Sequence, residues 1–350
     1  MSELWSQITS WDNVVHSYNQ TLKAQPKHNV QCIKFRKAET YNLKKLQKSI
    51  IEGTYSFSPH HLFEIFDPKH RIIHAPQYQD KIVHHMIYQV LRDVFEPKFI
   101  SDSYSCIRGK GAQRAVRRIQ HFMRSIENRY GEVWVYKLDV SKFFPSINHS
   151  ILKSALQRTI KCPLTLALCY KVIDGSPKSV GLPLGSVTSQ LFANVHINPL
   201  DHYMKRKMKA KWYVRYADDI FILSYSRDEV VKLGNACSDY LYDRLKLSCG
   251  KDKQYYHNAS TRGVDGLGYK IFPDHLLLKS EAKKRAVRRI RSQLKCLDRG
   301  AISINEVNLS LASWMSFVSL SKHDNFINSL SKRFPQLSLT HVMQIIGESK

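Results

Sequence analysis

Two adjacent aspartates, Asp218 and Asp219, interrupt a mostly apolar stretch at residues 213–223, which reads YVRYADDIFIL. The β-branched and aromatic residues on both sides favour two short strands, and the acidic pair favours a tight turn between them. Aspartate is common in turns, so a solvated acidic turn is one interpretation. The apolar flanks favour another, in which a buried hairpin holds the two like charges beside a bound cation.

A third carboxylate ends a second predicted strand. Residues 133–140 read VWVYKLDV, so Asp139 follows a β-rich run, and a helix is expected to begin near Asn148. Three carboxylates from two strands can hold two Mg²⁺ ions, the arrangement used for in-line nucleotidyl transfer. The sequence therefore predicts a two-metal site.

Other elements follow from apolar periodicity. Helices are expected at 78–95, after residue 111, twice within 149–175, from Ser186 to Lys209 with a bend at Pro199, and at 280–297 with a cap at Ser280. An amphipathic helix should contain Trp5, Ile8, Trp11 and Val15, a hairpin should form at 63–73, and a strand at 245–253. In the 280–297 helix, seven lysines and arginines surround the apolar stripe, which favours contact with phosphates over a solvated face.

Three blocks, in this order, resemble the reverse transcriptase family. Residues 138–147 (LDVSKFFPSI) are similar to its block with the first catalytic aspartate, 181–190 (GLPLGSVTSQ) to the next block, and 216–219 (YADD) to the YxDD box. The resemblance spans residues 30 to 320. It implies an α+β right-hand polymerase with fingers, a palm whose antiparallel sheet carries the YxDD hairpin, and a helical thumb.

The same resemblance implies a domain organisation and a catalytic site. The expected parts are an N-terminal extension (1–60), fingers (61–135), a palm (136–275, with 150–180 at its junction with the fingers) and a helical thumb (276–350). The implied cofactor is a pair of Mg²⁺ ions. The implied catalytic residues are Asp139, Asp218 and Asp219, and the implied metal ligands are Asp139, Val140, Asp218 and Asp219.

For the nucleotide, the hairpin at 63–73 resembles the fingertip that closes over the incoming triphosphate. The residues implied in dNTP binding are Arg71, Lys69, Phe144, Leu184 and Gly185. Phe144 is the fifth residue after Asp139, where the family has an aromatic gate that excludes ribose; a core aromatic is the alternative. Without the hairpin around it, Arg71 would be interpreted as a solvated surface charge.

Residues 266–271 resemble the family's primer-grip hairpin. Contacts with nucleic acid are implied for a further set of residues: Arg108, Gln190, Tyr216, Gly268, Tyr269, Arg285, Arg288 and Arg289. Gly109 and Gly111 bracket Lys110 before a predicted helix, a pattern that suits a phosphate but does not match a Walker loop. Lys251 aligns with a lysine that acts as general acid toward pyrophosphate, and a solvated lysine is the alternative.

Two positions that differ from the family's usual sequence resemble one subgroup of the family. Most members have Gln-Gly where this chain has Leu184-Gly185, and Ser-Pro where it has Ser189-Gln190. Both changes resemble reverse transcriptases of diversity-generating retroelements, which are related to group II intron enzymes. That implies error-prone, adenine-mutagenic copying of a template-repeat RNA for targeted gene diversification. The alternatives are a retron, group II intron or antiphage enzyme, or a non-catalytic RNA-binding module.

The implied partners are template RNA, the RNA/cDNA duplex, dNTPs and a basic pentameric accessory variability protein. Composition agrees with a polyanionic partner, because 54 Lys and Arg against 29 Asp and Glu give a formal net charge of +25. A membrane surface is the rival partner, but the basic residues are spread along the chain and no stretch is apolar enough to span a bilayer.

No secretion signal is visible, and seven scattered Cys without a C-x-x-C pair indicate reduced thiols and no zinc site. A cytoplasmic protein without membrane contact is expected.

Overall fold

A four-stranded antiparallel sheet forms the centre of the computed structural model, which describes residues 3–24, 29–66, 70–175, 179–321 and 324–335. The strands run in the order β4-β5-β3-β6. Their bounds are β3 Trp134–Val140, β4 Trp212–Tyr216, β5 Asp219–Ser224 and β6 Cys249–Asn258. β4 and β5 are the arms of the predicted acidic hairpin, and Tyr216 pairs with Asp219 beside its turn.

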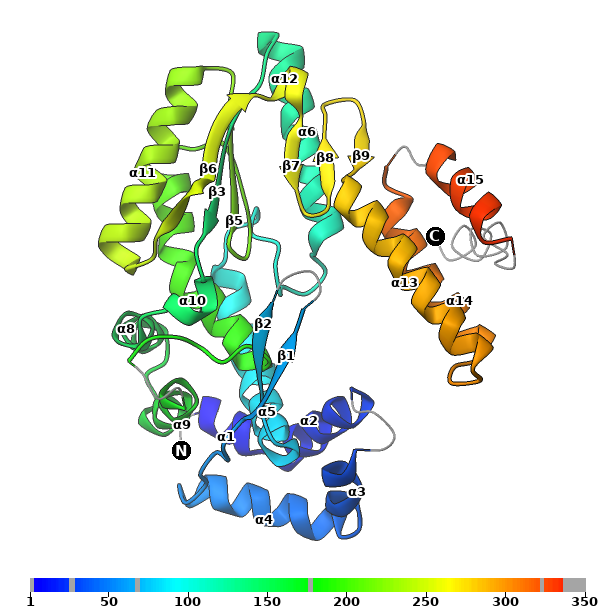
Figure 1. Ribbon diagram of the computed structural model, residues 1–350. Helices are drawn as coiled ribbons and strands as arrows, with labels where there is room; N and C mark the ends of the chain where they lie inside the picture. Colours follow the sequence, from blue (N-terminus) through cyan, green and yellow to red (C-terminus); the bar gives the residue numbers. More distant parts are fainter. Residues whose placement is uncertain (1–2, 25–28, 67–69, 176–178, 322–323, 336–350) are drawn as a thin grey trace.

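Both faces of this sheet are covered, as the apolar sequence of its strands requires. Alternate β3 side chains Tyr136 and Leu138 pack in one core with helices α10 (Val187–His202) and α11 (Arg227–Leu245), whereas Val135 packs in a second core with α6 (Ala112–Tyr130). Figure 1 shows α10 and α11 on one side of the sheet and α6 on the other. The acidic turn stands at one end of this layered body.

The first three N-terminal helices pack against α5 (Tyr78–Phe95), whose bounds are those predicted, and the fourth packs against those three. They are α1 Glu3–Thr9, α2 Trp11–Lys23, α3 Val30–Arg36 and α4 Glu39–Ile51. The single amphipathic helix expected from Trp5 to Val15 is divided in two at Ser10. The Ser10 side chain accepts a hydrogen bond from the Asn13 backbone N–H at 3.2 Å and so begins a new helix, and Trp11 is exposed.

The fingertip hairpin consists of β1 (His61–Ile65) and β2 (Arg71–Ala75). Its expected Asp-Pro turn and Lys69 lie outside the described residues. Towards the palm follow η1 (Glu96–Lys98), α7 (Phe143–Ser146), α8 (His149–Thr159) and α9 (Pro163–Asp174). The side chain of Asn148 caps α8 by accepting from the Ile151 N–H at 3.1 Å, so the helix begins where the sequence predicts.

Two expected boundaries are shifted. α10 ends at His202 and continues as a π-helical turn, Tyr203–Lys207, instead of running regularly to Lys209. π-helical turns are rare and occur mostly as single turns within helices; this one begins four residues after Pro199, which has no N–H to donate. The strand expected at 245–253 begins only at Cys249, because Leu245 still belongs to α11 and Lys246 ends that helix in the left-handed conformation, with φ of 55°.

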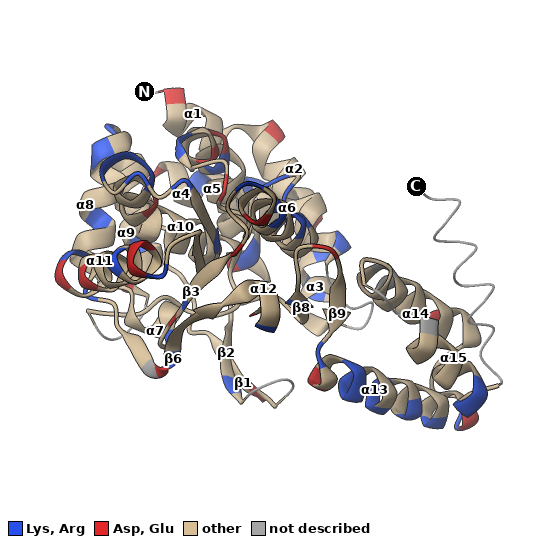
Figure 2. Ribbon diagram, turned by 90° about the horizontal axis from the view of Figure 1, so that it is seen from above, with Lys and Arg blue, Asp and Glu red and all other residues tan. Residues whose placement is uncertain are grey.

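The C-terminal part begins with α12 (Ala259–Arg262) and a small sheet of β7 (Val264–Gly266), β8 (Tyr269–Ile271) and β9 (Leu276–Leu278). Helices α13 (Ser280–Asp298), α14 (Ile304–Val318) and α15 (Asp324–Arg333) follow and form an arm beside the body (Figure 1). Ser280 is the first residue of α13 and not its cap; Lys279 holds that position without a side-chain cap bond. The predicted apolar stripe is buried at Ile290 and Leu294, and Figure 2 shows Lys and Arg along the rest of α13.

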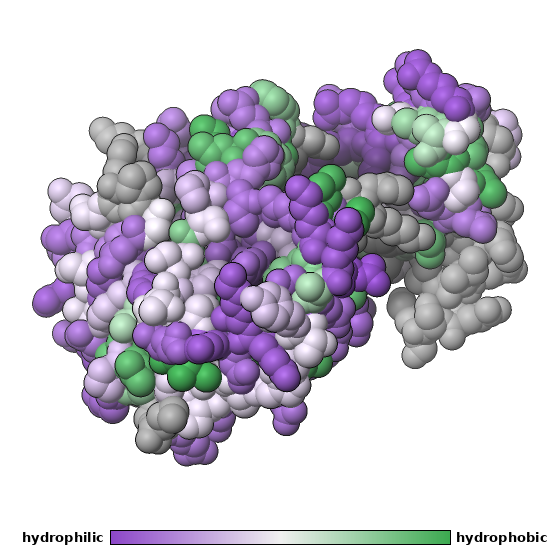
Figure 3. Space-filling view, turned by 90° about the horizontal axis from the view of Figure 1, so that it is seen from below, coloured by the Kyte–Doolittle hydropathy of each residue, from purple (hydrophilic) through white to green (hydrophobic). Residues whose placement is uncertain are grey.

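The molecular surface is mostly polar where Figure 3 displays it. Hydrophilic side chains dominate that face, and hydrophobic ones gather only in separate small patches. Among the described residues, no helix combines the length and apolar character needed to cross a bilayer.

Candidate active site

The three aspartates meet where β3 ends beside the β4–β5 turn. Asp139 of β3 is the register partner of Asp219 of β5, and the Val140 N–H donates to the carbonyl oxygen of Asp218 at 3.1 Å. Residues directly opposite each other on antiparallel strands point to the same face. The paired strands β3 and β5 therefore present Asp139 and Asp219 together, with Asp218 in the turn next to them.

The turn that carries Asp218 has an unusual backbone. Ala217 has φ of 52°, in the left-handed region where residues with a side chain are rare. A positive φ gives a two-residue hairpin turn a twist that matches the twist of its strands, so this conformation suits the hairpin. It strains the alanine by about 1–3 kcal/mol. The surrounding structure must hold the turn in this shape.

Two lysines contact carboxylates of this cluster. Lys137 Nζ lies 3.0 Å from Asp219 Oδ1, and Lys253 Nζ lies 2.7 Å from Asp139 Oδ1. Burial raises the pKa of Asp218; the Asp219 and Asp139 carboxylates raise it further, and Lys253 opposes the shift. The site thus concentrates negative charge that attracts cations.

The donor set fits a divalent cation such as Mg²⁺. Carboxylates supply the hard oxygen ligands that Mg²⁺ prefers, and the two ammonium groups already stand where positive charge is needed. Val140 is buried and apolar, so only its backbone carbonyl can be a ligand. Within the described ranges no group of three or more His, Cys, Asp or Glu side chains is arranged as a ready cation cage.

The residues predicted for the nucleotide pocket come from three segments that hydrogen bonds join. The Phe144 carbonyl accepts from the Leu182 N–H at 2.9 Å, and the Leu184 carbonyl accepts from the His74 N–H of β2 at 2.8 Å. Gly185 has φ of 130°, and a Cβ there would lie 3.0 Å from the His74 carbonyl oxygen. The structure therefore places the end of β2, the loop at 181–185 and Phe144 side by side.

Comparison with known proteins places this geometry in a family. The family described as reverse transcriptase (RNA-dependent DNA polymerase) matches residues 66–271, more than half of the chain. The chain belongs to this family. The match begins directly after β1 and ends with β8, so it includes all three aspartates.

Individual relatives of this reverse transcriptase include group II intron-encoded proteins. It is 24% identical to protein YkfC of Escherichia coli over 285 residues, 69% of this chain and 72% of that protein. It is 25% identical to the group II intron-encoded protein LtrA of Lactococcus lactis over 180 residues, 48% of this chain and only 29% of LtrA.

The fold has a counterpart among solved structures. Telomerase from Candida tropicalis, solved with a fragment of telomeric RNA, aligns with a TM-score of 0.51 at 12% identity. The alignment covers 87% of this chain and 61% of the telomerase chain. The expected right-hand α+β fold is thereby confirmed.

The fingers-side residues of the reverse transcriptase predicted to bind nucleic acid lie in different settings. Arg108 forms ion pairs with Asp93 and Glu96, so its charge is already compensated within the fingers. Lys110 donates to the carbonyl oxygens of Ser101 and Ser103 at 2.7 and 2.8 Å, so this lysine holds the loop instead of lying free for a phosphate.

On the palm, Gln190 is exposed in the first turn of α10, and Tyr216 is half-buried at the end of β4. In the β7–β8 turn, Gly268 has φ of 89°, and a Cβ there would come within 2.7 Å of Phe317 Cζ on α14. Tyr269 is buried and donates its hydroxyl to the Phe317 carbonyl at 2.5 Å. This hairpin therefore also connects the body to the arm.

On the arm, Arg288 and Arg289 are exposed on α13, and Arg285 is half-buried. At the fingertip, Arg71 is exposed at the start of β2. These arginines keep the accessibility that phosphate contacts require.

Sequence reasoning missed three charged residues at the site. The side chain of Lys251, the expected general acid, is outside the described part; the lysine that contacts Asp139 is Lys253, two residues later on β6. Lys137 precedes Asp139 by two residues on β3, so strand periodicity could have placed it on the same face. Arg215 had no such signal, because a charged residue inside a predicted strand gives no indication of a buried partner.

Proposed function

We propose that this reverse transcriptase copies RNA by adding dNTPs to a primer 3′-OH, and that it does so with low fidelity in a diversity-generating retroelement. The observation that supports the catalytic part is the gathering of Asp139, Asp218 and Asp219 at the end of β3 and the β4–β5 turn. The subtype is supported by Leu184 and Gln190, where the family usually has other residues. Extension of a primed RNA by the purified chain, followed by sequencing of the cDNA, tests both parts.

In the proposed reaction the three aspartates and the Val140 carbonyl would hold divalent ions, which reverse transcriptases generally use. Ions bound there would supply a lower pKa for the primer 3′-OH and positive charge for the triphosphate. Lys137 and Lys253 limit the repulsion among the carboxylates before the ions enter. Arg71, at the start of β2, is proposed to contact the phosphates.

Phe144 is proposed to select deoxyribose. It is half-buried, 5.6 Å from the Phe143 ring centroid to centroid, and its carbonyl holds the loop that contains Leu184. Phe144→Val should raise the efficiency of rNTP incorporation relative to dNTP by roughly 10- to 100-fold, because one steric contact in a pocket discriminates by about 1–3 kcal/mol. Single-turnover incorporation of matched dNTP and rNTP measures the ratio, and the dNTP rate of the same variant is the control. An unchanged ratio would assign Phe144 to the core alone.

Leu184 is proposed to loosen the pocket around the new base pair. Its side chain can neither donate nor accept a hydrogen bond, whereas a glutamine at this position can; one such bond contributes about 0.5–1.5 kcal/mol. Leu184→Gln should therefore lower the error rate opposite template adenine about two- to tenfold, since about 1.4 kcal/mol corresponds to a factor of ten. The Leu184 backbone bond to His74 is kept in the variant.

The measurement is the cDNA error spectrum on one RNA template for the wild type, Leu184→Gln and an apolar control, Leu184→Met. Equal errors opposite adenine in all three would rule Leu184 out as a cause. A wild type that copies adenine as accurately as the other bases would overturn the diversity-generating assignment and leave a retron, group II intron or antiphage type of enzyme.

RNA is also proposed to bind outside the catalytic cleft. Residues 205–211 contain five lysines and arginines and no acid, and Lys205 joins them to α6 because both Lys205 and Arg118 contact Asp102 at 2.8 Å. A hollow of about 670 Å³ beside them is lined partly by Lys98, Lys205 and Arg206. This acid-poor surface suits an RNA backbone.

The net positive charge of the chain also affects how the proposed accessory protein can bind. A basic pentamer and a chain with a net charge of +25 repel each other at long range. Structured RNA between the two proteins would remove that repulsion. We therefore place RNA at the centre of the proposed ribonucleoprotein.

A further inference from the structure

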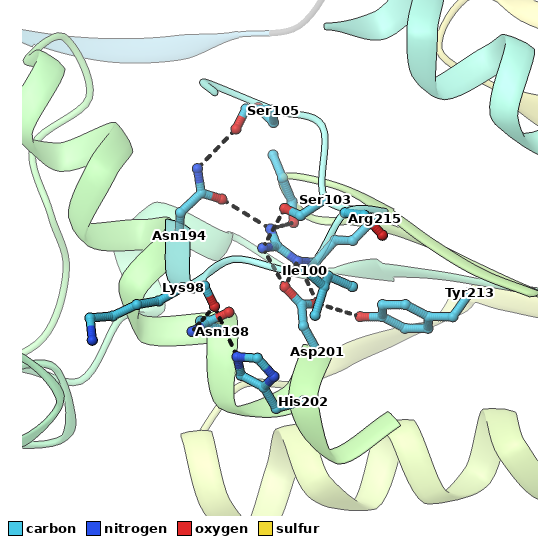
Figure 4. Close-up of polar contacts among 12 residues, drawn as sticks. Lys98, Ile100, Ser103, Ser105, Asn194, Asn198, Asp201, His202, Tyr213 and Arg215 are labelled. Carbon is cyan, nitrogen blue, oxygen red and sulfur yellow. Dashed lines mark hydrogen bonds and ion pairs between the residues drawn. The ribbon is translucent and has the colours of Figure 1, made fainter. Parts of the chain in front are cut away.

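Arg215 is the largest fully buried side chain of the described residues, and it lies directly beneath the catalytic turn. Its guanidinium forms a two-pronged ion pair with Asp201 of α10, with Nε 2.8 Å from Oδ1 and Nη2 2.7 Å from Oδ2. Tyr213 also donates to Asp201, at 2.7 Å, as Figure 4 shows. The charge pair is thus complete without any contribution from the turn.

A further bond of the guanidinium reaches the turn itself. Arg215 Nη1 donates to the carbonyl oxygen of Ala217 at 3.1 Å. Ala217 is the residue with the positive φ of 52°, and Asp218 follows it directly. Because a left-handed alanine returns to an ordinary conformation unless it is held, this bond bears on where the Asp218 carboxylate stands.

The same arginine connects the turn to the fingers side. Its Nη2 donates to Ser103 Oγ at 2.9 Å and its Nη1 to Asn194 Oδ1 at 3.1 Å, and Asn194 in turn donates to the Ser105 carbonyl at 2.9 Å. The backbone of 102–104 runs beside β4, with the Arg215 N–H donating to the Asp102 carbonyl at 2.9 Å. Figure 4 shows Asn194 and Ser103 on either side of the guanidinium.

We propose that Arg215 is a positioning residue for catalysis: with Asp201 as its counter-ion, it fixes the Ala217–Asp218 turn in the conformation that places Asp218 at the metal site. The proposal rests on the proposed polymerase function. A purely structural role would need only the ion pair between Arg215 and Asp201, which is already complete. The role proposed here needs the additional hydrogen bond from Arg215 to the Ala217 carbonyl.

Two variants separate positioning from stability. Arg215→Lys keeps a cation for Asp201 but has one nitrogen in place of three, so it loses the bond to Ala217. The triple variant Arg215→Met, Asp201→Leu, Tyr213→Phe removes the buried charges altogether, and well-packed apolar replacements of buried ion pairs often preserve stability. For each, thermal melting and RNA affinity report on the fold.

The expected result is a drop in kcat of roughly 10- to 100-fold in both variants, with KM for dNTP and the RNA Kd within about twofold of wild type, since a displacement of about 1 Å costs rates of this size. Both variants should also bind Mn²⁺ more weakly than the wild type does, as measured by electron paramagnetic resonance on the protein alone. Adding Ala217→Gly should recover part of the lost rate, because glycine adopts a positive φ without strain.

A triple variant with the wild-type kcat and Mn²⁺ affinity would overturn the proposal. So would an Arg215→Lys variant that is fully active, or a loss of rate that follows the melting temperature and is not relieved by Ala217→Gly. Failure of the wild type to extend any primed RNA would instead contradict the proposed function, and the Mn²⁺ titration would still test the role of Arg215.

Discussion

Asp218→Asn should abolish dNTP incorporation on a primed RNA, lowering the rate by about 10³-fold or more. The substitution keeps the size of the side chain and removes one of the three charges that meet at the β4–β5 turn. Metal-assisted charge stabilisation contributes several kcal/mol, and each 1.4 kcal/mol is about a tenfold change. Single-nucleotide extension in Mg²⁺ measures the rate.

RNA affinity of the same variant should stay within about threefold of wild type, because most of the binding energy comes from basic side chains elsewhere. Asp228→Asn is the matched control: Asp228 is exposed in the first turn of α11, beyond the far end of β5, and its change should leave the rate unaltered. Normal incorporation by Asp218→Asn would refute the catalytic assignment, and the chain would then be better described as an RNA-binding module.

The affinity for RNA should fall by about 10³-fold or more between 50 and 200 mM salt, the behaviour of a protein that neutralises six or more phosphates. The expected origin is the acid-poor face of α13, where Lys284, Arg288, Arg289, Arg291 and Lys295 are exposed. Binding isotherms at several salt concentrations give the slope of log K against log salt.

Removing two of these charges, in Arg288→Gln with Arg289→Gln, should reduce that slope by about 1.4 to 1.8, which is 0.7 to 0.9 for each lost phosphate contact. The control removes two exposed charges from α11, with Lys232→Gln and Arg244→Gln, and should leave the slope nearly unchanged. An affinity that does not respond to salt would contradict the proposal that phosphates are the main ligand.

Much of the architecture was accessible from sequence because local patterns and tertiary structure agree. The helix at 78–95 has its apolar residues on one face throughout, and the strands around the acidic turn are apolar on both sides. Predictions were wrong where a local capping bond overrides periodicity, as at Ser10, or where a helix extends into an expected strand, as at Leu245.

At the candidate site, motif spacing identified the aspartates but not the groups that balance them. Lys253 meets Asp139 across the β3–β6 ladder, and Asp201 meets Arg215 between a helix and a strand. Those contacts depend on strand register and helix orientation, which no single segment encodes. Buried charge pairs of this kind become visible only when the elements are placed in three dimensions.

The arm of α13–α15 is built differently from the rest of the molecule. Ile290, Leu294 and Met315 belong to a core of its own, and the Phe317 contacts with Gly268 and Tyr269 connect that arm to the body. Val318 at the end of α14 is also buried in the core that contains Val135 and Phe221 of the sheet, so the joint is packed. The expected consequence is a stiff clamp: opening it to admit an RNA–DNA hybrid beside α13 would disturb the buried contacts of Phe317 and Val318.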